Sequence, residues 1–166
     1  MNNCYLDAEA VITFFRMTGR KHIFITGSRG SGKSHLVNNM LKYMSDSFNL
    51  LQSHRTDTPQ VVIKSNLVAD NKEFVIGVPR TSGINPASKG NNMTIIEDGF
   101  INCAIPAIDT HLDTTPEMLF VIDELGYLES SCIPFQKAVE KLLDNSHVLA
   151  VIRKQSTEFL NRICNR

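Results

Sequence analysis

The sequence predicts an α/β protein in three layers, with a mostly parallel central sheet flanked by helices on both faces. Two observations favour this fold class. Continuous apolar runs of strand length occur at Ile23–Ile25, Met118–Ile122 and Val148–Ile152, and strands that are apolar on both faces are typical of a buried parallel sheet. Segments in which apolar residues recur at helical spacing separate these runs along the chain, as connections between parallel strands require.

The first third of the chain predicts a helix, a strand and a second helix. Apolar residues recur with a helical period over about residues 5–18, Asp7 stands near the start of this segment and Gly19 directly follows it. The strand Ile23–Ile25 comes next and runs into a glycine-rich turn. A second helix is expected from Lys33 to about residue 45, because leucine, valine and methionine again recur at helical spacing.

The middle of the chain is less regular, and the last third regains a clear rhythm. Short β-rich runs and turn residues predict four elements in the middle: strands at Val61–Ile63, Glu73–Val78 and Thr94–Ile96, and a short helix at Pro106–Leu112. The segment Arg80–Asn92 contains two glycines, a proline and three asparagines, which predicts a mobile surface loop. Helices are expected at about Pro134–Leu143 and at Thr157–Cys164, after the two long apolar strands.

Size and composition indicate one ordinary globular domain. The chain has 166 residues, 42% of them hydrophobic and 20% charged, and it shows no internal repeat or low-complexity linker, so we expect a single domain over residues 1–166. The 17 basic residues balance the 17 acidic ones. A nucleic-acid or anionic-membrane partner is therefore not expected, because both need a basic surface, and no run approaches the roughly 20 apolar residues of a membrane span.

The cysteines and the N-terminal segment point to the cytoplasm. The four cysteines are scattered, at Cys4, Cys103, Cys132 and Cys164. Because none forms a Cys-x-x-Cys pair, we expect reduced thiols rather than a zinc site or a disulfide framework. The N-terminal segment carries Asp7 and Glu9 and lacks a long apolar core, so it does not have the pattern of a signal peptide.

The glycine-rich turn carries the strongest motif. Residues Gly27–Ser34 match the pattern Gly-x-x-x-x-Gly-Lys-Ser, between a strand and a helix. Such a loop points backbone N–H groups at phosphate oxygens, and the helix adds the positive end of its dipole. Lys33 would bridge the β- and γ-phosphates, and the Ser34 hydroxyl would bind Mg²⁺. For the Arg29 side chain, both a phosphate contact and a solvated position remain open. The expected nucleotide-binding residues are Gly27, Ser28, Arg29, Gly30, Ser31, Gly32, Lys33, Ser34 and His35.

A second candidate group follows the strand Met118–Ile122. Asp123 and Glu124 come directly after this apolar run, and ligands of open parallel sheets bind at the carboxyl ends of strands. We expect Asp123 to hold Mg²⁺ together with Ser34. Glu124 would take a proton from an attacking water as a general base, which with Lys33 gives the expected catalytic pair. The alternative is that one of the two acids only caps the strand or pairs with a surface lysine.

The stretch from Val121 to residue 155 resembles the THEP-type, or cancer-related, nucleoside-triphosphatases. That family has a phosphate loop near its N-terminus and an Asp-Glu-Ile-Gly-Lys-Met-Glu-like motif, followed by a helix that contains phenylalanine and by an apolar strand. The motif reads here Asp123-Glu124-Leu125-Gly126-Tyr127-Leu128-Glu129, and Phe135 lies on the helix that follows. Tyr127 stands where the family usually has lysine, and the middle of the chain has no clear match.

The resemblance implies a RecA-like P-loop NTPase fold and Mg²⁺-dependent hydrolysis of ATP, GTP and related triphosphates to diphosphate and phosphate. Four residues keep two interpretations open. Glu129 either points back toward the site or is an ordinary acid near a helix N-terminus. Arg153 and Lys154 follow the last apolar strand, and one of them either stabilises transition-state charge or is a solvated base. Arg80 is a weaker candidate for the same role.

Two other functions use the same residues. A nucleotide or small-molecule kinase shares the phosphate loop, but kinases usually carry an arginine-rich lid, and the segment Arg80–Asn92 contains only Arg80 and Lys89 as basic residues. A nucleotide-dependent switch or adaptor would hydrolyse triphosphate to time an interaction with a protein partner that the sequence does not identify. No Asn-Lys-x-Asp motif for guanine is present, so the choice between ATP and GTP stays open.

Overall fold

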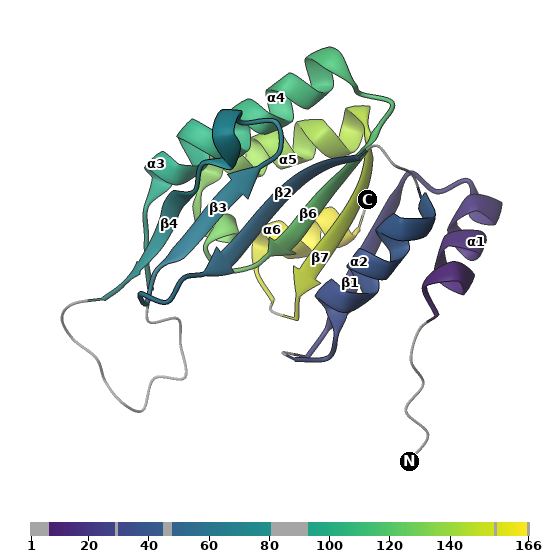
Figure 1. Cartoon of the computed structure of the whole chain (residues 1–166), viewed down its shortest axis with the longest axis horizontal. Helices are drawn as coiled ribbons and strands as arrows, with labels where there is room; N and C mark the ends of the chain where they lie inside the picture. Colours follow the sequence, from purple (N-terminus) through teal and green to yellow (C-terminus); the bar gives the residue numbers. More distant parts are fainter. Residues whose placement is uncertain (1–6, 29, 45–47, 81–92, 155, 166) are drawn as a thin grey trace.

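In the part of the chain that the structure describes, a seven-stranded sheet forms the centre (Figure 1). The computed structural model describes residues 7–28, 30–44, 48–80, 93–154 and 156–165. Across the sheet the strands follow the order β1-β7-β6-β2-β3-β4-β5. Their bounds are β1 His22–Gly27, β2 Phe48–Arg55, β3 Val61–Ser65, β4 Phe74–Pro79, β5 Met93–Ile95, β6 Leu119–Leu125 and β7 His147–Arg153.

The sheet has a parallel half and an antiparallel half. Strands β1, β7, β6 and β2 pair in parallel, whereas β3, β4 and β5 extend the sheet through antiparallel pairs. Five of the seven described strands therefore run in the same direction, which agrees with the predicted mostly parallel sheet. The carboxyl ends of the four parallel strands meet at one edge of the sheet.

Helices cover both faces of the sheet (Figure 1). Their bounds are α1 Ala8–Thr18, α2 Lys33–Met44, α3 Glu97–Gly99, α4 Ile105–Thr114, α5 Ile133–Asn145 and α6 Glu158–Cys164, with a π-helical turn, η2 Phe100–Ala104, between α3 and α4 and short 3₁₀ turns at η1 Ala69–Asn71 and η3 Glu129–Ser131. Among the residues that the structure describes, no helix combines the length and the apolarity that a bilayer crossing demands.

Alternate residues of the parallel strands supply the two hydrophobic cores. Val121 and Val151 pack with α1 and α2 on one face. Phe120 and Ile152 pack on the other face with apolar residues of α4, α5 and α6. The continuous apolar runs of the sequence are thus strands buried on both sides, and the three predicted layers are present.

The structure corrects several sequence-based expectations in the middle of the chain. Strand β2 was not predicted, because its sequence FNLLQSHR becomes polar in its second half. The helix expected at Pro106–Leu112 is longer and forms the last part of a helical run that begins at Glu97. The predicted mobile loop is described only at Arg80, since residues 81–92 lie outside the described residues.

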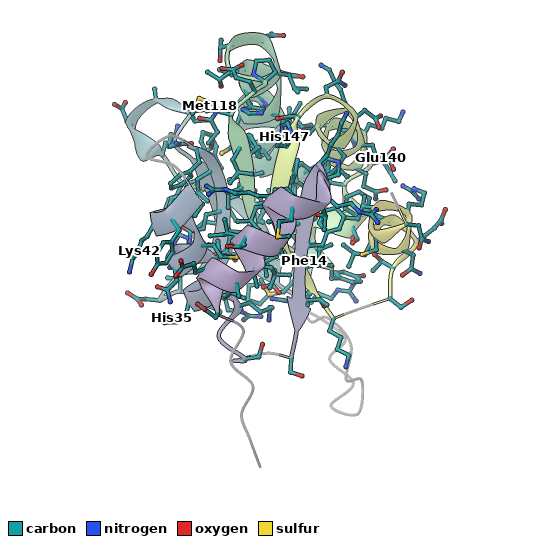
Figure 2. All side chains as sticks on the ribbon, turned by 90° about the vertical axis from the view of Figure 1, so that its right-hand side faces the viewer. Phe14, His35, Lys42, Met118, Glu140 and His147 are labelled. Carbon is teal, nitrogen blue, oxygen red and sulfur yellow. The ribbon has the colours of Figure 1, made fainter. Side chains whose placement is uncertain are left out.

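A buried polar chain joins three elements at the end of the sheet away from the phosphate loop. Figure 2 shows this end at Met118 and His147, opposite His35 at the start of α2. The fully buried imidazole of His111 accepts at Nδ1 from Asn49 Nδ2 (2.8 Å), and His111 Nε2 lies 2.6 Å from Ser146 Oγ. Ser146 Oγ in turn donates to the Pro116 carbonyl (2.8 Å). This order of donors and acceptors needs a neutral imidazole with its proton on Nε2.

We expect His111 to make stability depend on pH. Burial lowers the pKa of His111 below its ordinary value, more than Glu117 raises it. In the unfolded chain the imidazole titrates near 6.5, so below about pH 6.5 the unfolded state takes up protons that the folded state excludes. As the pH falls below about 6.5, the free energy of unfolding should therefore decrease by up to about 1.4 kcal/mol per pH unit. Above about pH 6.5, His111 should contribute no pH dependence.

Urea unfolding between pH 5.5 and 8 measures this dependence, with the variant His111→Gln as the comparison that cancels the other histidines. The wild-type free energy should drop more steeply than that of the variant below pH 6.5. Parallel curves for the two proteins would contradict the assignment.

Candidate active site

A cavity of about 880 Å³ opens where the parallel strands end. The phosphate loop after β1 forms one wall. Glu124, Gly126 and Arg153 line it from the ends of β6 and β7, and His54 and Arg55 line it from the end of β2. Residues that are far apart in the sequence thus share one pocket, as expected for a parallel sheet.

The phosphate loop depends on two glycines with positive φ. Gly30 has φ 75° and Gly32 has φ 83°, values that glycine adopts at little cost and other residues rarely adopt. The Ser31 N–H donates to the Ser28 carbonyl (3.2 Å), and the Leu36 N–H donates to the Gly32 carbonyl (2.9 Å), which starts α2 directly after the loop. Arg29 lies outside the described residues.

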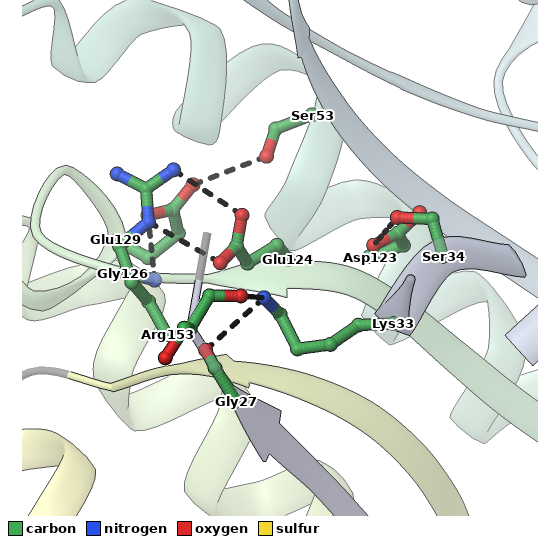
Figure 3. A network of polar contacts seen from close by, with 10 residues as sticks. Gly27, Lys33, Ser34, Ser53, Asp123, Glu124, Gly126, Glu129 and Arg153 are labelled. Atoms are coloured by element: carbon green, nitrogen blue, oxygen red, sulfur yellow. Dashed lines mark hydrogen bonds and ion pairs between the residues drawn. The ribbon is translucent and has the colours of Figure 1, made fainter. Parts of the chain in front are cut away.

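Lys33 and His35, in the first turn of α2, border the pocket from the loop side. The Lys33 ammonium turns back over the loop and donates to the carbonyls of Gly27 (3.2 Å) and Ser28 (3.0 Å) (Figure 3). His35 lines the cavity and pairs through Nε2 with Asn39 at 3.1 Å. Every described residue of the expected nucleotide-binding set, Gly27, Ser28, Gly30, Ser31, Gly32, Lys33, Ser34 and His35, lines the cavity.

Ser34 and Asp123 meet between α2 and β6. The Ser34 hydroxyl donates to Asp123 Oδ1 at 3.4 Å, and Figure 3 shows the two side chains together. Asp123 is buried, and burial raises the pKa of its carboxyl, with a smaller contribution from Glu124 in the same direction. Hydrogen bonds from Gln52 and Ser34 and the charge of Lys33 act against this rise in pKa.

A shift in register places Glu124. Asp123 pairs with Val151, whereas Leu125 already pairs with Ile152, so β6 advances by two residues while β7 advances by one. Such an extra residue re-aims a side chain at the end of a strand. Leu125 joins the core that contains Phe120 and Ile152, and Glu124 is left at the cavity.

Arg153 is the direct partner of Glu124. Arg153 Nε donates to Glu124 Oε1 and Arg153 Nη2 donates to Glu124 Oε2, both at 3.2 Å (Figure 3). The hydrogen bond to Glu124 is the largest cause that raises the pKa of Arg153, and the charges of Glu124 and Glu129 add to it. The sequence left Arg153 open as a transition-state group or a solvated base, and it did not indicate this pair.

Glu129 points back toward the site, which is the first of its two predicted alternatives. Its carboxylate is buried and accepts from the Gly126 N–H (2.9 Å) and from the Ser53 hydroxyl (3.3 Å). Burial is the main cause that raises the pKa of Glu129, whereas the backbone hydrogen bonds and Arg153 lower it. Ser53, His54 and Arg55 line the pocket from β2, and no pattern in the sequence indicated them.

The remaining candidates divide between the pocket and its surroundings. Lys154 lines the cavity beside Arg153, and Tyr127 lines it beside Gly126. Arg80 is exposed after β4 and is not among the described residues of the lining.

Comparisons with known proteins identify the family. The family model described as NTPase matches residues 22–166. The nucleoside-triphosphatase THEP1 of Thermotoga sp. (strain RQ2) is 26% identical over 146 residues, which cover 87% of this chain and 80% of the relative. The chain belongs to the THEP-type nucleoside-triphosphatase family. THEP1 of Thermotoga maritima is 23% identical over 145 residues, with the same coverage of both chains.

Solved structures of the THEP-type family share this fold. The crystal structure of THEP1 from Aquifex aeolicus has a TM-score of 0.67 at 19% identity and covers 87% of this chain and 84% of its own. The solution structure of a human cancer-related nucleoside triphosphatase has a TM-score of 0.64 at 18% identity. The match covers 89% of this chain and 85% of the human chain. The resemblance found in the sequence is thus confirmed at the level of family and fold.

We expect Gly32→Ala to weaken the binding of a nucleoside triphosphate to the loop. An alanine at φ 83° costs about 1–2 kcal/mol, which corresponds to roughly a 5- to 30-fold loss of affinity if the loop must keep this backbone when it binds. Gly19→Ala is the matched control, because Gly19 also has positive φ (62°) but caps α1 away from the loop. Calorimetric titration with a non-hydrolysable triphosphate measures both. Equal affinities for wild type and Gly32→Ala would contradict the expected role of this backbone conformation.

Proposed function

We propose that this member of the THEP-type family hydrolyses nucleoside triphosphates such as ATP or GTP to diphosphate and phosphate with Mg²⁺, and that Glu124 is the general base. One observation carries the proposal. The described residues of the phosphate loop and Glu124 line a single cavity, and Asp123 accepts a hydrogen bond from Ser34 of that loop, which supports a phosphate cradle, metal-binding oxygens and a base for water.

Different residues of the cavity would have different roles in phosphoryl transfer. The glycine backbone of the loop positions the phosphates, with Gly30 and Gly32 in the conformation that a tight loop requires. The Lys33 ammonium, which now bonds the carbonyls of Gly27 and Ser28, is within a side-chain rotation of any anion on the loop. Glu124 then accepts the proton of the water that attacks the terminal phosphorus, and the diphosphate leaves with the bridging oxygen.

Ser34 and Asp123 fit a magnesium site. Their hydroxyl and carboxylate oxygens lie 3.4 Å apart, and Mg²⁺ prefers such hard oxygen donors together with phosphate oxygens and water. When bound, the ion neutralises negative charge on the triphosphate. The two side chains also orient each other, because Ser34 donates to the carboxylate before either binds a cation.

Glu124→Gln should keep nucleotide binding and reduce turnover by about a hundredfold or more, because glutamine cannot accept the proton of the attacking water. Steady-state phosphate release and titration with a non-hydrolysable triphosphate separate the two effects. Glu117→Gln, at an exposed position before β6, is the control for loss of a negative charge. Turnover that survives Glu124→Gln would rule out the base assignment.

Phosphate release across ATP, GTP, CTP and UTP, with and without Mg²⁺, tests the function itself. We expect release from at least one triphosphate, and at least a tenfold loss when the metal is removed by chelation, because the charge on the triphosphate is then no longer neutralised. Addition of candidate acceptors distinguishes hydrolysis from a kinase reaction, in which release would give way to transfer. Flat traces with all four nucleotides would count against the proposal.

We also propose that the protein works in the cytoplasm. Three described cysteines, Cys103, Cys132 and Cys164, are free thiols, and the first two are buried. Free thiols are typical of a reducing compartment. Burial raises the pKa of Cys103 to about 11, which makes this thiol inert at neutral pH.

A further inference from the structure

The pair of Arg153 and Glu124 raises a conflict with the role of Glu124 as a base. Both carboxylate oxygens accept from the guanidinium, each at 3.2 Å. A base must offer a lone pair to the water that it deprotonates, and the fork of the arginine here engages one lone pair of each oxygen and fixes the orientation of the carboxylate. The orientation of Glu124 seen in the structure is therefore set by its ion pair with Arg153.

Arg153 is also well placed for a second partner. In the pairing of β1 with β7, Arg153 stands directly opposite Gly27, the first residue of the phosphate loop, and it lines the cavity with Lys33 and Glu124. A planar guanidinium matches phosphate oxygens as well as it matches a carboxylate. An anion on the loop would therefore lie within reach of the same side chain.

We propose that Arg153 exchanges Glu124 for the terminal phosphate of the bound triphosphate. The exchange breaks two hydrogen bonds to Glu124 and forms new ones to phosphate oxygens, without transfer of a proton or an electron pair. It frees the carboxylate for water and at the same time adds a positive charge beside the phosphoryl group that is transferred. Binding of a triphosphate, but not of a diphosphate, thereby switches on the base. This inference rests on the proposed hydrolysis.

The surroundings of Arg153 suit such an exchange. The side chain of Arg153 is 49% exposed and that of Glu124 is 25% exposed, and ion pairs in contact with water are weak enough to be displaced. Arg153 Cδ and Nε lie across Gly126, 3.5 Å from where a β-carbon would stand. The charge of the buried Glu129 also acts on Arg153, so the guanidinium stays at the cavity wall when it leaves Glu124.

Arg153→Ala and Arg153→Lys test the proposal through binding and turnover. Titration with a non-hydrolysable triphosphate and with the diphosphate should show that Arg153→Ala loses about tenfold in triphosphate affinity and little in diphosphate affinity. Its kcat should fall by about a hundredfold or more, because an arginine that contacts the transferred group contributes at least that much. Arg153→Lys, which keeps the charge but not the fork, should lie between wild type and Arg153→Ala in both measurements.

A double variant and a control complete the experiment. Glu124→Gln combined with Arg153→Ala should be no slower than the slower single variant, because residues that act as one unit give non-additive losses. Arg20→Ala, at an exposed position before β1, should match the wild type. Thermal unfolding of each variant shows whether it is folded, and Arg153→Lys serves for the comparison if the alanine variant is not.

Three results would overturn the inference. The first is unchanged kcat with an unchanged preference for triphosphate over diphosphate in Arg153→Ala. The second is a raised kcat, which would mean that Arg153 only restrains Glu124. The third is an equal loss of affinity for the triphosphate and the diphosphate together with a lower unfolding temperature, which is expected if the ion pair is only structural. A wild-type protein without turnover would instead refute the proposed hydrolysis, while the preference for triphosphate in the titration would still test the contact with Arg153.

Discussion

The register of the four parallel strands is the constraint on which the site depends. Pairing of β1 with β7 puts Gly27 opposite Arg153, and pairing of β2 with β6 puts Gln52 opposite Asp123. No covalent link or short loop joins these residues, so hydrogen bonds between strands are what bring the phosphate loop, the acids and the arginine to one edge. A slip of one residue would turn every side chain of a strand to the opposite face. It would exchange residues such as Phe120 and Val121 between the two cores, which close packing opposes.

Charge balance explains why the acids of the site can stay close to one another. Asp123, Glu124 and Glu129 gather within seven residues of sequence, and burial raises the pKa values of Asp123 and Glu129. Lys33 lowers the pKa of Asp123, and Arg153 lowers that of Glu129. The acids thus share two cations that a phosphate would also attract, and binding of an anion redistributes the interactions of the whole group.

Local sequence patterns predicted the layers of the fold and the phosphate loop. They did not predict strand β2 or the side-chain contacts of the site, which depend on residues far apart in the sequence. The apolar runs of β6 and β7 and the Gly-x-x-x-x-Gly-Lys-Ser motif were sufficient for the three layers and for the phosphate loop. Strand β2 escaped prediction because its last residues are polar and line the cavity instead of a core. The pairing of Glu124 with Arg153 arises from the extra residue in β6, and the hydrogen bond from Ser53 to Glu129 joins residues 76 positions apart. Neither contact has a local pattern in the sequence.

The place of β1 in the sheet has a consequence for biosynthesis. This strand lies at the edge and pairs with β7, so His22 meets Val148. As a ribosome releases the chain from its N-terminus, the phosphate loop emerges before β7, the strand that pairs with β1, because β7 follows the other described strands in the sequence. Contacts between residues so distant in sequence form slowly. Local contacts between the antiparallel strands can therefore form before β7 has emerged, whereas the cavity can be completed only after it.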